Sequence, residues 1–401
     1  MRTEFEAIVS GTVTSPKGFL AGAVQAGIKG QKGLDLAILC SEKSCVAAGV
    51  FTTNTIKAAP VIISQKHLQD KRAQAIVVNA GCANACTGEP GLADASEMAR
   101  SVAEKLGLPT TDVLIASTGV IGVPLPMDKV RAGVSKIALT KDGGHELARA
   151  IMTTDTSPKE IAITINASGG GFTLGGVAKG AGMIHPNLAT MLCFLTTDAA
   201  VDPDFLQSAL QKAVDASFNM ITIDGDTSPS DTVVLLANGL AGNATINERN
   251  GQLFQEALNQ VCLYLAKCIA RDGEGATKLI EVIVEGALSE AQARLAARTI
   301  ASSPLVKSAI HGNDPNWGRV IAALGRSGSK VDETKLVAYL NDFCVMRQGK
   351  PVPFNKQEAS NSLDNKEVSL RLELNLGSGK ATAWGCDLSE EYVTINSAYT
   401  S

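Results

Sequence analysis

The sequence predicts a layered α/β protein with a smaller α+β domain at its C-terminal end, and three observations support this prediction. The chain has 401 residues, of which 45% are hydrophobic, so it is long enough for two domains with a substantial core. Short apolar runs alternate with amphipathic runs through the first part of the chain. After Gly286 the pattern changes to one long helical run followed by further strands. We therefore expect a layered domain over residues 1–280 and an α+β domain over residues 281–401.

Strands of the first domain are expected where short apolar or β-branched runs are bounded by Gly, Asn, Asp or Pro. Helices are expected where apolar residues recur at spacings of three and four. Asp202 followed by Pro203 predicts a helix start, and Gly107 after Leu106 predicts a helix end. The expected strands are 36–39, 47–52, 75–78, 113–115, 161–165 and 191–197, and the expected helices are 94–106, 127–138, 146–152, 203–216 and 253–271.

The second domain is expected to begin with a helix over residues 289–302. Apolar runs after it predict further strands. No fixed-period repeat or low-complexity tract is present, which argues against a solenoid or an interaction tail. The expected strands of this domain are 320–323, 336–340, 369–376 and 381–386.

The charge balance indicates a small-molecule partner. The chain has 36 basic and 40 acidic residues and a net charge of −4, which gives no electrostatic footprint for nucleic acid or an anionic membrane. No run approaches the roughly 18 apolar residues of a spanning helix, and the N-terminal region lacks a signal-peptide core. We therefore expect a soluble, cytoplasmic protein that binds neither nucleic acid nor membrane.

The cysteine and histidine pattern indicates neither disulfides nor a metal site. The nine cysteines are scattered, and several lie within apolar runs, where reduced, buried cysteine is common. Cys82 and Cys86 are too far apart for a C-x-x-C pair, and only four histidines are present.

A possible self-cleavage site lies in the stretch KGAGMIHPNLATMLCF, residues 179–194. Seven glycines between Gly169 and Gly182 predict a loosened loop, and Pro186 stiffens the approach to Thr190. A threonine hydroxyl held against its preceding carbonyl can attack it, and hydrolysis of the resulting ester frees an α-amine that serves as a base to its own hydroxyl. Taken alone, the stretch also fits an ordinary glycine-rich turn into a core strand.

This stretch resembles the cleavage-site signature of the ornithine acetyltransferase (glutamate N-acetyltransferase) family of arginine biosynthesis. The resemblance extends through further motifs from PKGF at residues 16–19 to the last residue. It implies an N-terminal-nucleophile-like αββα arrangement for the first domain, with the C-terminal tail returning to the active site. It also implies cleavage between Ala189 and Thr190, giving fragments 1–189 and 190–401 that assemble as a heterotetramer with two copies of each.

The resemblance assigns the oxyanion hole to Thr118 and Gly119. These residues lie in ASTGVIG, residues 116–122, where a strand end runs into a glycine turn. A hydroxyl and a backbone N–H at such a position can point at one spot, although the local pattern alone favours a routine strand-to-loop turn.

Two charged residues are assigned to substrate binding by the resemblance. Lys179 and Glu274 each lie beside glycines and, taken alone, would be read as solvated charges. An ammonium at Lys179 can anchor a substrate carboxylate and lower the pKa of a new α-amine by like-charge repulsion. A carboxylate at Glu274 is a natural partner for the side-chain amine of ornithine.

The resemblance also places Thr153, Thr190, Asn396 and Ser401 in the substrate pocket. The local pattern at Thr153 is that of a capping turn, and chain tails are usually frayed. The alternating run 392–401 can nevertheless dock as a strand.

Other features of the sequence carry no chemistry that we can derive. The run DGDTS, residues 224–228, has its glycine in the wrong place for a calcium loop and fits a polar turn near the active site. The run NDPNWGR, residues 313–319, fits a turn with an aromatic anchor. Cys82 and Ala398 depart from residues common in the family. His185 is a weak candidate for a base, because a nucleophile that supplies its own amine needs none.

The expected reaction is transfer of an acetyl group from N-acetylornithine to glutamate by a ping-pong mechanism through acetyl-Thr190. No cofactor is expected, although acetyl-CoA could serve as a second donor. One alternative is a self-cleaving amidohydrolase or aminopeptidase of the related fold, in which water replaces glutamate. Another is a non-catalytic metabolite-binding protein whose chain stays uncut.

Overall fold

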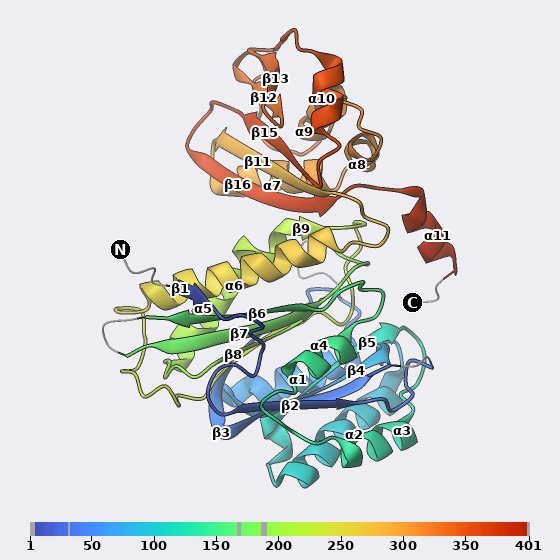
Figure 1. The fold of residues 1–401 in the computed structure, drawn as a ribbon, viewed down its shortest axis with the longest axis vertical. Coiled ribbons are helices and arrows are strands. Elements are labelled where there is room, and N and C mark those ends of the chain that lie inside the picture. The colour runs from blue at the N-terminus through green and yellow to red at the C-terminus, as the bar shows by residue number, and fades with distance from the viewer. Residues whose placement is uncertain (1–4, 31–32, 167–169, 186–190, 399–401) are drawn as a thin grey trace.

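Two β-sheets stacked along the long axis organise the molecule (Figure 1). The structure, a computed structural model, describes residues 5–30, 33–166, 170–185 and 191–398. The larger sheet is built from the first two thirds of the chain, and the smaller sheet from the last third with one short strand of the first part. The layered α/β class and the smaller C-terminal α+β unit predicted from the sequence are confirmed.

The larger sheet runs in the order β1-β6-β7-β8-β10-β3-β4-β5, with β2 paired to β3. Most neighbours are antiparallel, but β4 pairs parallel with β5, and β8 with β10. Its strands are β1 (Phe5–Ala7), β2 (Phe19–Val24), β3 (Leu36–Phe51), β4 (Arg72–Cys82), β5 (Val113–Val120), β6 (Lys159–Ile165), β7 (Phe172–Lys179), β8 (Leu192–Thr197) and β10 (Thr232–Ala237).

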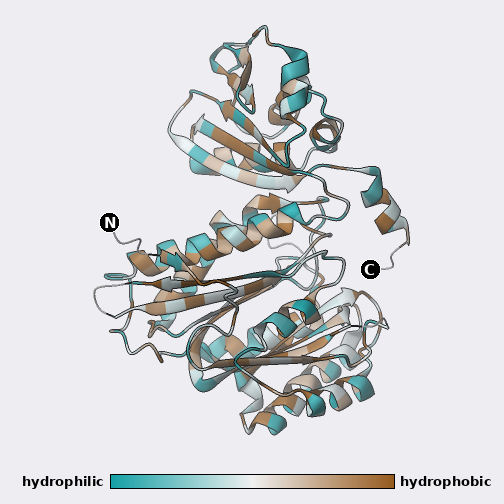
Figure 2. Ribbon diagram, in the orientation of Figure 1, coloured by the Kyte–Doolittle hydropathy of each residue, from teal (hydrophilic) through white to brown (hydrophobic). Residues whose placement is uncertain are grey.

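Helices cover both faces of this sheet, because alternate residues of its strands are apolar on both sides. Helix α4 (Gly144–Ile151) packs on one face against β2 and β3. On the other face, α5 (Pro203–Ala216) and α6 (Gln252–Arg271) pack at one end, and α1 (Ala59–His67), α2 (Gly88–Leu106) and α3 (Met127–Lys136) pack at the other. Figure 2 shows the hydrophobic residues concentrated in the strands and the hydrophilic ones on the outer helix turns.

The smaller sheet runs in the order β14-β13-β12-β15-β11-β16-β9. Helix α6 contacts β6 and β7 of the larger sheet and also β16, so it lies between the two sheets. The strands are β9 (Ile221–Thr222), β11 (Leu279–Ala287), β12 (Val337–Leu340), β13 (Phe343–Arg347), β14 (Lys350–Pro351), β15 (Glu367–Glu373) and β16 (Gly379–Cys386). The helices are α7 (Glu290–Ala301), α8 (Pro304–His311), α9 (Trp317–Gly325), α10 (Lys356–Ser362) and α11 (Glu390–Ala398).

Two strand predictions for the C-terminal part are wrong. Residues 320–323 lie within helix α9, whose buried residues Val320, Ala323 and Leu324 follow helical spacing. The tail, expected to dock as a strand, forms helix α11, whose first turn carries Glu390 and Glu391 at the positive end of the helix dipole. In Figure 1 this helix leaves the smaller sheet and turns back towards the larger one.

The glycine-rich run before residue 182 is also not the loop that the sequence suggested. Most of it is strand β7, in which Gly175 and Gly176 are buried. A Cβ added at Gly175 would lie 2.5 Å from the carbonyl oxygen of Thr12, and one at Gly176 would lie 2.8 Å from Leu195 Cδ2. These two glycines therefore permit close packing on both faces of the sheet and do not form a turn.

Residues 36–39 and 47–51 of the two predicted strands belong to the single strand β3, which has a shift of register between Cys40 and Cys45. All nine cysteines are unpaired. Within the described parts of the chain, no helix is both long enough and apolar enough to cross a bilayer.

Candidate active site

One cavity brings together residues from seven separate segments of the chain. These are the residue after β4, the end of β5, the turn after α4, the end of β7 with the turn that follows it, the turns before β10 and after α6, and helix α11. Six of the residues expected from the sequence line it: Thr118, Gly119, Thr153, Lys179, Glu274 and Asn396. The other three, Ala189, Thr190 and Ser401, lie outside the described residues.

Lys179, the last residue of β7, forms one wall of the cavity. Its side chain is 3% exposed, so it is not the solvated charge that its local sequence suggested. The Nζ atom donates to Thr153 Oγ1 at 2.7 Å and to Thr118 Oγ1 at 3.4 Å. The lysine therefore links the expected substrate-binding threonine to the expected oxyanion threonine.

A buried carboxylate lies behind this lysine. Asp155 Oδ2 lies 3.9 Å from Lys179 Nζ, and Asp155 Oδ1 accepts from Lys159 Nζ at 2.7 Å and from the Gly180 backbone N–H at 2.7 Å. Burial alone would raise the pKa of Asp155, but the two ammonium groups and this N–H lower it to about 2. Asp155 is therefore charged at neutral pH.

The pKa of Lys179 is lowered from its ordinary value because burial disfavours the charged form. Asp155, Glu274 and Asp231 oppose that effect, and Lys159 adds to it. The charge of Lys179 thus depends on the carboxylates around it.

Gly119 occupies a position that only glycine fits. Its φ is +129°, and it pairs with Gly81 where the parallel strands β4 and β5 end. A Cβ at Gly119 would lie 2.3 Å from the carbonyl carbon of Gly81. The close approach of the two strand ends places Thr118, the preceding residue, at the cavity wall.

Glu274 packs directly against a second glycine of the cavity lining, Gly182. Its carboxylate accepts from Asn396 Nδ2 at 2.7 Å, and its backbone N–H donates to Ala181 O at 2.8 Å. A Cβ at Gly182 would lie 2.5 Å from Glu274 Oε2, so the glycine provides the space for this carboxylate. Glu274 is buried, which corrects the local reading of a solvated turn residue.

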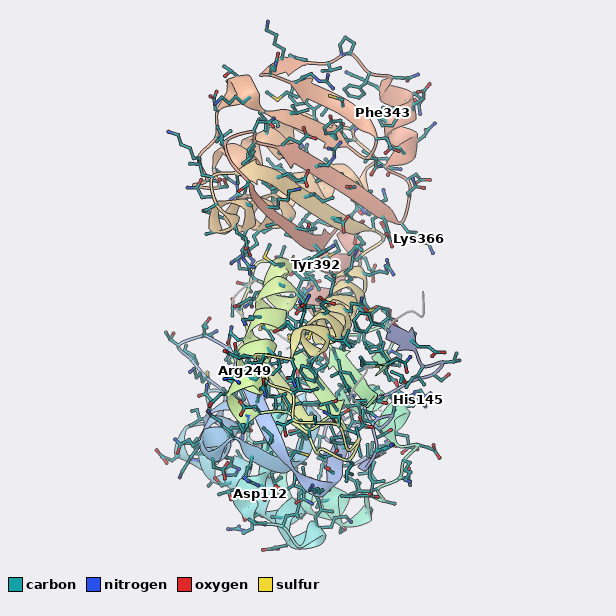
Figure 3. The ribbon with its side chains drawn as sticks, turned by 90° about the vertical axis from the view of Figure 1, so that its left-hand side faces the viewer. Asp112, His145, Arg249, Phe343, Lys366 and Tyr392 are labelled. Carbon is teal, nitrogen blue, oxygen red and sulfur yellow. The ribbon has the colours of Figure 1, made fainter. Side chains whose placement is uncertain are left out.

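The C-terminal helix α11 supplies Tyr392 and Asn396 to the cavity. Its start is fixed by Ser389, whose hydroxyl donates to Gly275 O at 2.6 Å and accepts from the Tyr392 N–H at 3.3 Å. Figure 3 shows Tyr392 at the level where the two halves of the molecule meet. The tail reaches the cavity, as the family resemblance implied, but as a helix.

The polar turn expected at residues 224–228 supplies acidic residues to the cavity. Asp224 and Asp226, from the expected polar turn, line it. Asp224 accepts from the backbone N–H groups of Met183 and Ile184, yet burial raises its pKa. Burial and the nearby Asp224 also raise the pKa of Tyr392. The sequence analysis expects this turn near the active site, and the structure has it in the lining of the cavity.

Asp231 is a further residue that the sequence analysis missed. It is fully buried directly before β10, and its Oδ1 accepts from the Met191 N–H at 3.1 Å. Burial raises its pKa well above the usual range. Met191 is covalently bonded to Thr190, so this carboxyl group adjoins the expected cleavage site. The available signal was an acid directly before the run TVVLLA, in which every residue except the first is apolar.

His185 is not among the residues that line the cavity. Its Nδ1 lies 3.2 Å from Thr222 Oγ1, and burial lowers its pKa. The lining of the cavity thus includes an ammonium group and carboxyl groups, a combination that suits a small molecule carrying both charges.

The comparisons with known proteins agree on one family. The ArgJ family model matches residues 20–401. The arginine biosynthesis bifunctional protein ArgJ of Dehalococcoides mccartyi is 55% identical, with 100% of both chains covered. The crystal structure of the bifunctional protein ArgJ from Bacillus halodurans is 44% identical over 51% of this chain and 97% of that chain, with a TM-score of 0.50. The ornithine acetyltransferase of Mycobacterium tuberculosis, solved with ornithine, is 42% identical over 45% of this chain and 98% of that chain, with a TM-score of 0.43.

Proposed function

This chain belongs to the ArgJ family and is an acyltransferase of arginine biosynthesis, and we propose that it moves an acetyl group from N-acetylornithine to glutamate through Thr190. The observation that carries the proposal is the convergence of the described residues on one cavity. Lys179 contacts Thr118 and Thr153 on one side, and Glu274 is held by Asn396 on another. These are the groups that an acyl transfer between amino acids requires.

The ammonium and the carboxylates of the cavity match the two charged ends of the donor. Lys179 can bind the α-carboxylate of N-acetylornithine, whose α-amine is neutral because it carries the acetyl group. Glu274 can accept from the side-chain ammonium of the same molecule. Glutamate lacks that ammonium, so Glu274 is expected to matter more for the donor than for the acceptor.

Thr190 is the proposed nucleophile, exposed by self-cleavage after Ala189. Two observations support this. Asp231 holds the N–H of the next residue, Met191, and so fixes the backbone directly after the scissile region. The match with the solved B. halodurans chain covers 97% of that chain but only 51% of this one. The solved chain is therefore about half as long as this chain, which is the length expected of a cleaved fragment.

The reaction then proceeds in two half-reactions. The Thr190 α-amine takes the hydroxyl proton as the Thr190 oxygen attacks the acetyl carbonyl, and Thr118 and Gly119 donate to the oxygen that becomes negative. The C–N bond breaks, the proton passes to the departing α-amine of ornithine, and an acetyl ester remains on Thr190. The α-amine of glutamate attacks this ester, and the Thr190 oxygen recovers its proton.

We also propose which molecules donate the acetyl group and how the fragments assemble. We infer no resident cofactor, because the donor amide already carries the acetyl group. The relatives are named bifunctional, which supports acetyl-CoA as a second donor to glutamate. A cytoplasmic heterotetramer of two N-terminal and two C-terminal fragments completes the proposal.

The fate of the acetyl group tests this function. With N-acetylornithine alone, the C-terminal fragment should gain the mass of one acetyl group. With glutamate added, N-acetylglutamate should form at rates that give parallel double-reciprocal lines. Release of free acetate as fast as N-acetylglutamate would instead establish a hydrolase. An uncut chain that binds these molecules without transfer would establish a binding protein.

A further inference from the structure

The contacts of Lys179 determine the direction of two hydroxyl groups. A lysine ammonium can only donate hydrogen bonds, so Thr118 Oγ1 and Thr153 Oγ1 both accept from it. Each hydroxyl must then donate its own proton elsewhere. Both threonines line the cavity, so the cavity is where those protons are available. A neutral lysine amine could itself accept from a hydroxyl, and the proton would then turn away from the substrate.

Asp155 lies next to Lys179 but is not among the residues that line the cavity. Its side chain is fully buried and is held by the backbone N–H groups of Thr153 and Gly180. Thr153 itself lines the cavity, and Gly180 directly follows the cavity residue Lys179. Lys159 binds the same carboxylate and also donates to Asp272 at 2.5 Å.

We propose that Asp155 is a positioning residue for the acetyl transfer: it keeps Lys179 charged and thereby turns the Thr118 hydroxyl proton towards the substrate carbonyl. The inference rests on the proposed function, because it assigns Thr118 to the oxyanion. The inference adds a condition on the charge of Lys179 that the two half-reactions do not state. The oxyanion donor is correctly oriented only while Lys179 is an ammonium.

The charged groups that face Lys179 come from several elements. Asp155 follows α4, Asp231 precedes β10, and Glu274 follows α6; each favours the ammonium when it is itself ionised. Lys159 on β6 and Lys29, which follows β2, carry charges of the same sign as Lys179. Among the residues that the structure describes, Asp155 is the one whose carboxylate lies within 4.0 Å of Lys179 Nζ.

The sign of the pH effect follows from these charges. Lys179 has a lowered pKa because of burial, so its ammonium is lost as the pH rises through that value. Activity should therefore fall on the alkaline side. Removing the Asp155 charge should lower the pKa of Lys179 further and move this alkaline limb to lower pH, by about one pH unit or more.

The test compares pH–rate profiles of cleaved enzyme with N-acetylornithine and glutamate. Asp155→Asn should shift the alkaline limb of kcat downwards, and Asp155→Glu, which keeps the charge, should restore it. Asp272→Asn is the matched control, because it removes a carboxylate from the other side of Lys159. The Asp272→Asn variant should leave the alkaline limb of the kcat profile unshifted, even if the variant is less stable. An unshifted limb in Asp155→Asn would overturn the inference.

A second variant covers the case in which Asp155→Asn does not fold. Lys159→Gln removes a like charge that lowers the pKa of Lys179, so the limb should move to higher pH. A limb that stayed in place in this variant would also overturn the inference.

Titration of carbon-13-labelled lysine by NMR, assigned with Lys179→Met, reports the charge of Lys179 without any turnover. If the wild-type enzyme moved no acetyl group, the proposed function would fail, and that result needs no variant. If transfer occurred and Asp155→Asn lowered the Lys179 pKa without moving the limb, the function would stand and the inference would fall.

Discussion

Asn396 Nδ2 donates to Glu274 Oε2 at 2.7 Å and so joins the C-terminal helix to the turn after α6, 122 residues earlier in the chain. Asn396 also donates to Tyr392 O at 3.0 Å, within its own helix. The carboxylate that we assign to the donor's ammonium is therefore held by the tail itself. Helix α11 has no buried residues, so it is joined to the rest of the protein by contacts such as this one.

Glu274→Gln should weaken the use of N-acetylornithine. A charge-assisted hydrogen bond contributes about 1.5–3 kcal/mol, so kcat/KM for the donor should fall by roughly 10–100-fold. Self-cleavage should be intact, because the lost charge faces the substrate. Initial rates at varied donor concentration measure the effect. Glu281→Gln is the control, since Glu281 pairs with Lys267 and Trp384 outside the cavity. An equal loss in both variants would contradict the assignment.

Thr190→Ala should leave one uncut chain. The variant lacks the hydroxyl that attacks the preceding carbonyl, so mass spectrometry should detect the full 401 residues instead of fragments 1–189 and 190–401. Thr190→Ser should still cleave, because serine also has a hydroxyl. Two normal fragments from Thr190→Ala would rule out self-cleavage at this residue.

Thr118→Ala should lower turnover by roughly a hundredfold or more, as loss of one oxyanion donor does in other enzymes. The KM for the donor should change much less, because the interaction strengthens only in the transition state. Thr118→Ser keeps the hydroxyl and serves as the control. Cleavage of each variant must be checked first by mass. A fully cleaved Thr118→Ala enzyme with an unchanged kcat would exclude Thr118 as a donor.

The sequence predicts well those elements whose signals are local. Helix α5 begins at Pro203, as predicted, because Asp202 accepts from the backbone N–H groups of Asp204 and Phe205. Residues 320–323 of helix α9 were predicted as a strand, because four apolar residues in a row do not distinguish a buried strand from a buried helix. Strand β7 was missed because its glycines serve packing against distant residues, which no local pattern reveals.

The residues of the site likewise divide into those with a local sequence signal and those that depend on the fold. The motif residues Thr118, Lys179 and Glu274 meet in one cavity, as the family resemblance implied. Asp155 could not be found from the sequence, because its role arises from burial and from neighbours on other strands. For Asp231 the only signal is an acid directly before an apolar run, and its burial is set by the fold. The sequence places Asp155 in a turn, and only the fold places two ammonium groups beside it.

Asp231 is a buried carboxyl group that the folded protein holds at a cost. Its Oδ1 accepts from Met191, while its Oδ2 has no hydrogen-bond partner within the described part of the chain. Thr52 donates to Ser228 O at 2.7 Å, and Ser228 Oγ accepts from Ser230 N at 3.0 Å. The hydroxyls of Thr52 and Ser228 lower the pKa of Asp231 by less than burial raises it. Burial therefore dominates and raises the pKa of Asp231.

Asp231→Asn should stabilise the fold at neutral and alkaline pH. Because the folded-state pKa of Asp231 is raised, the folded protein binds a proton that the unfolded chain releases above about pH 4, so the wild type loses stability as the pH rises. Asparagine keeps the acceptor for the Met191 N–H and carries no charge. The unfolding midpoint should therefore rise by a few degrees at pH 8, on the order expected for 1–2 kcal/mol, and change little at pH 4. Both chains should carry Thr190→Ala so that both are uncut, and Asp204→Asn, at an exposed ion pair with Lys71, should show no such dependence. An Asp231→Asn chain that is equally destabilised at both pH values would show that the carboxyl group is needed for packing and not held at a cost.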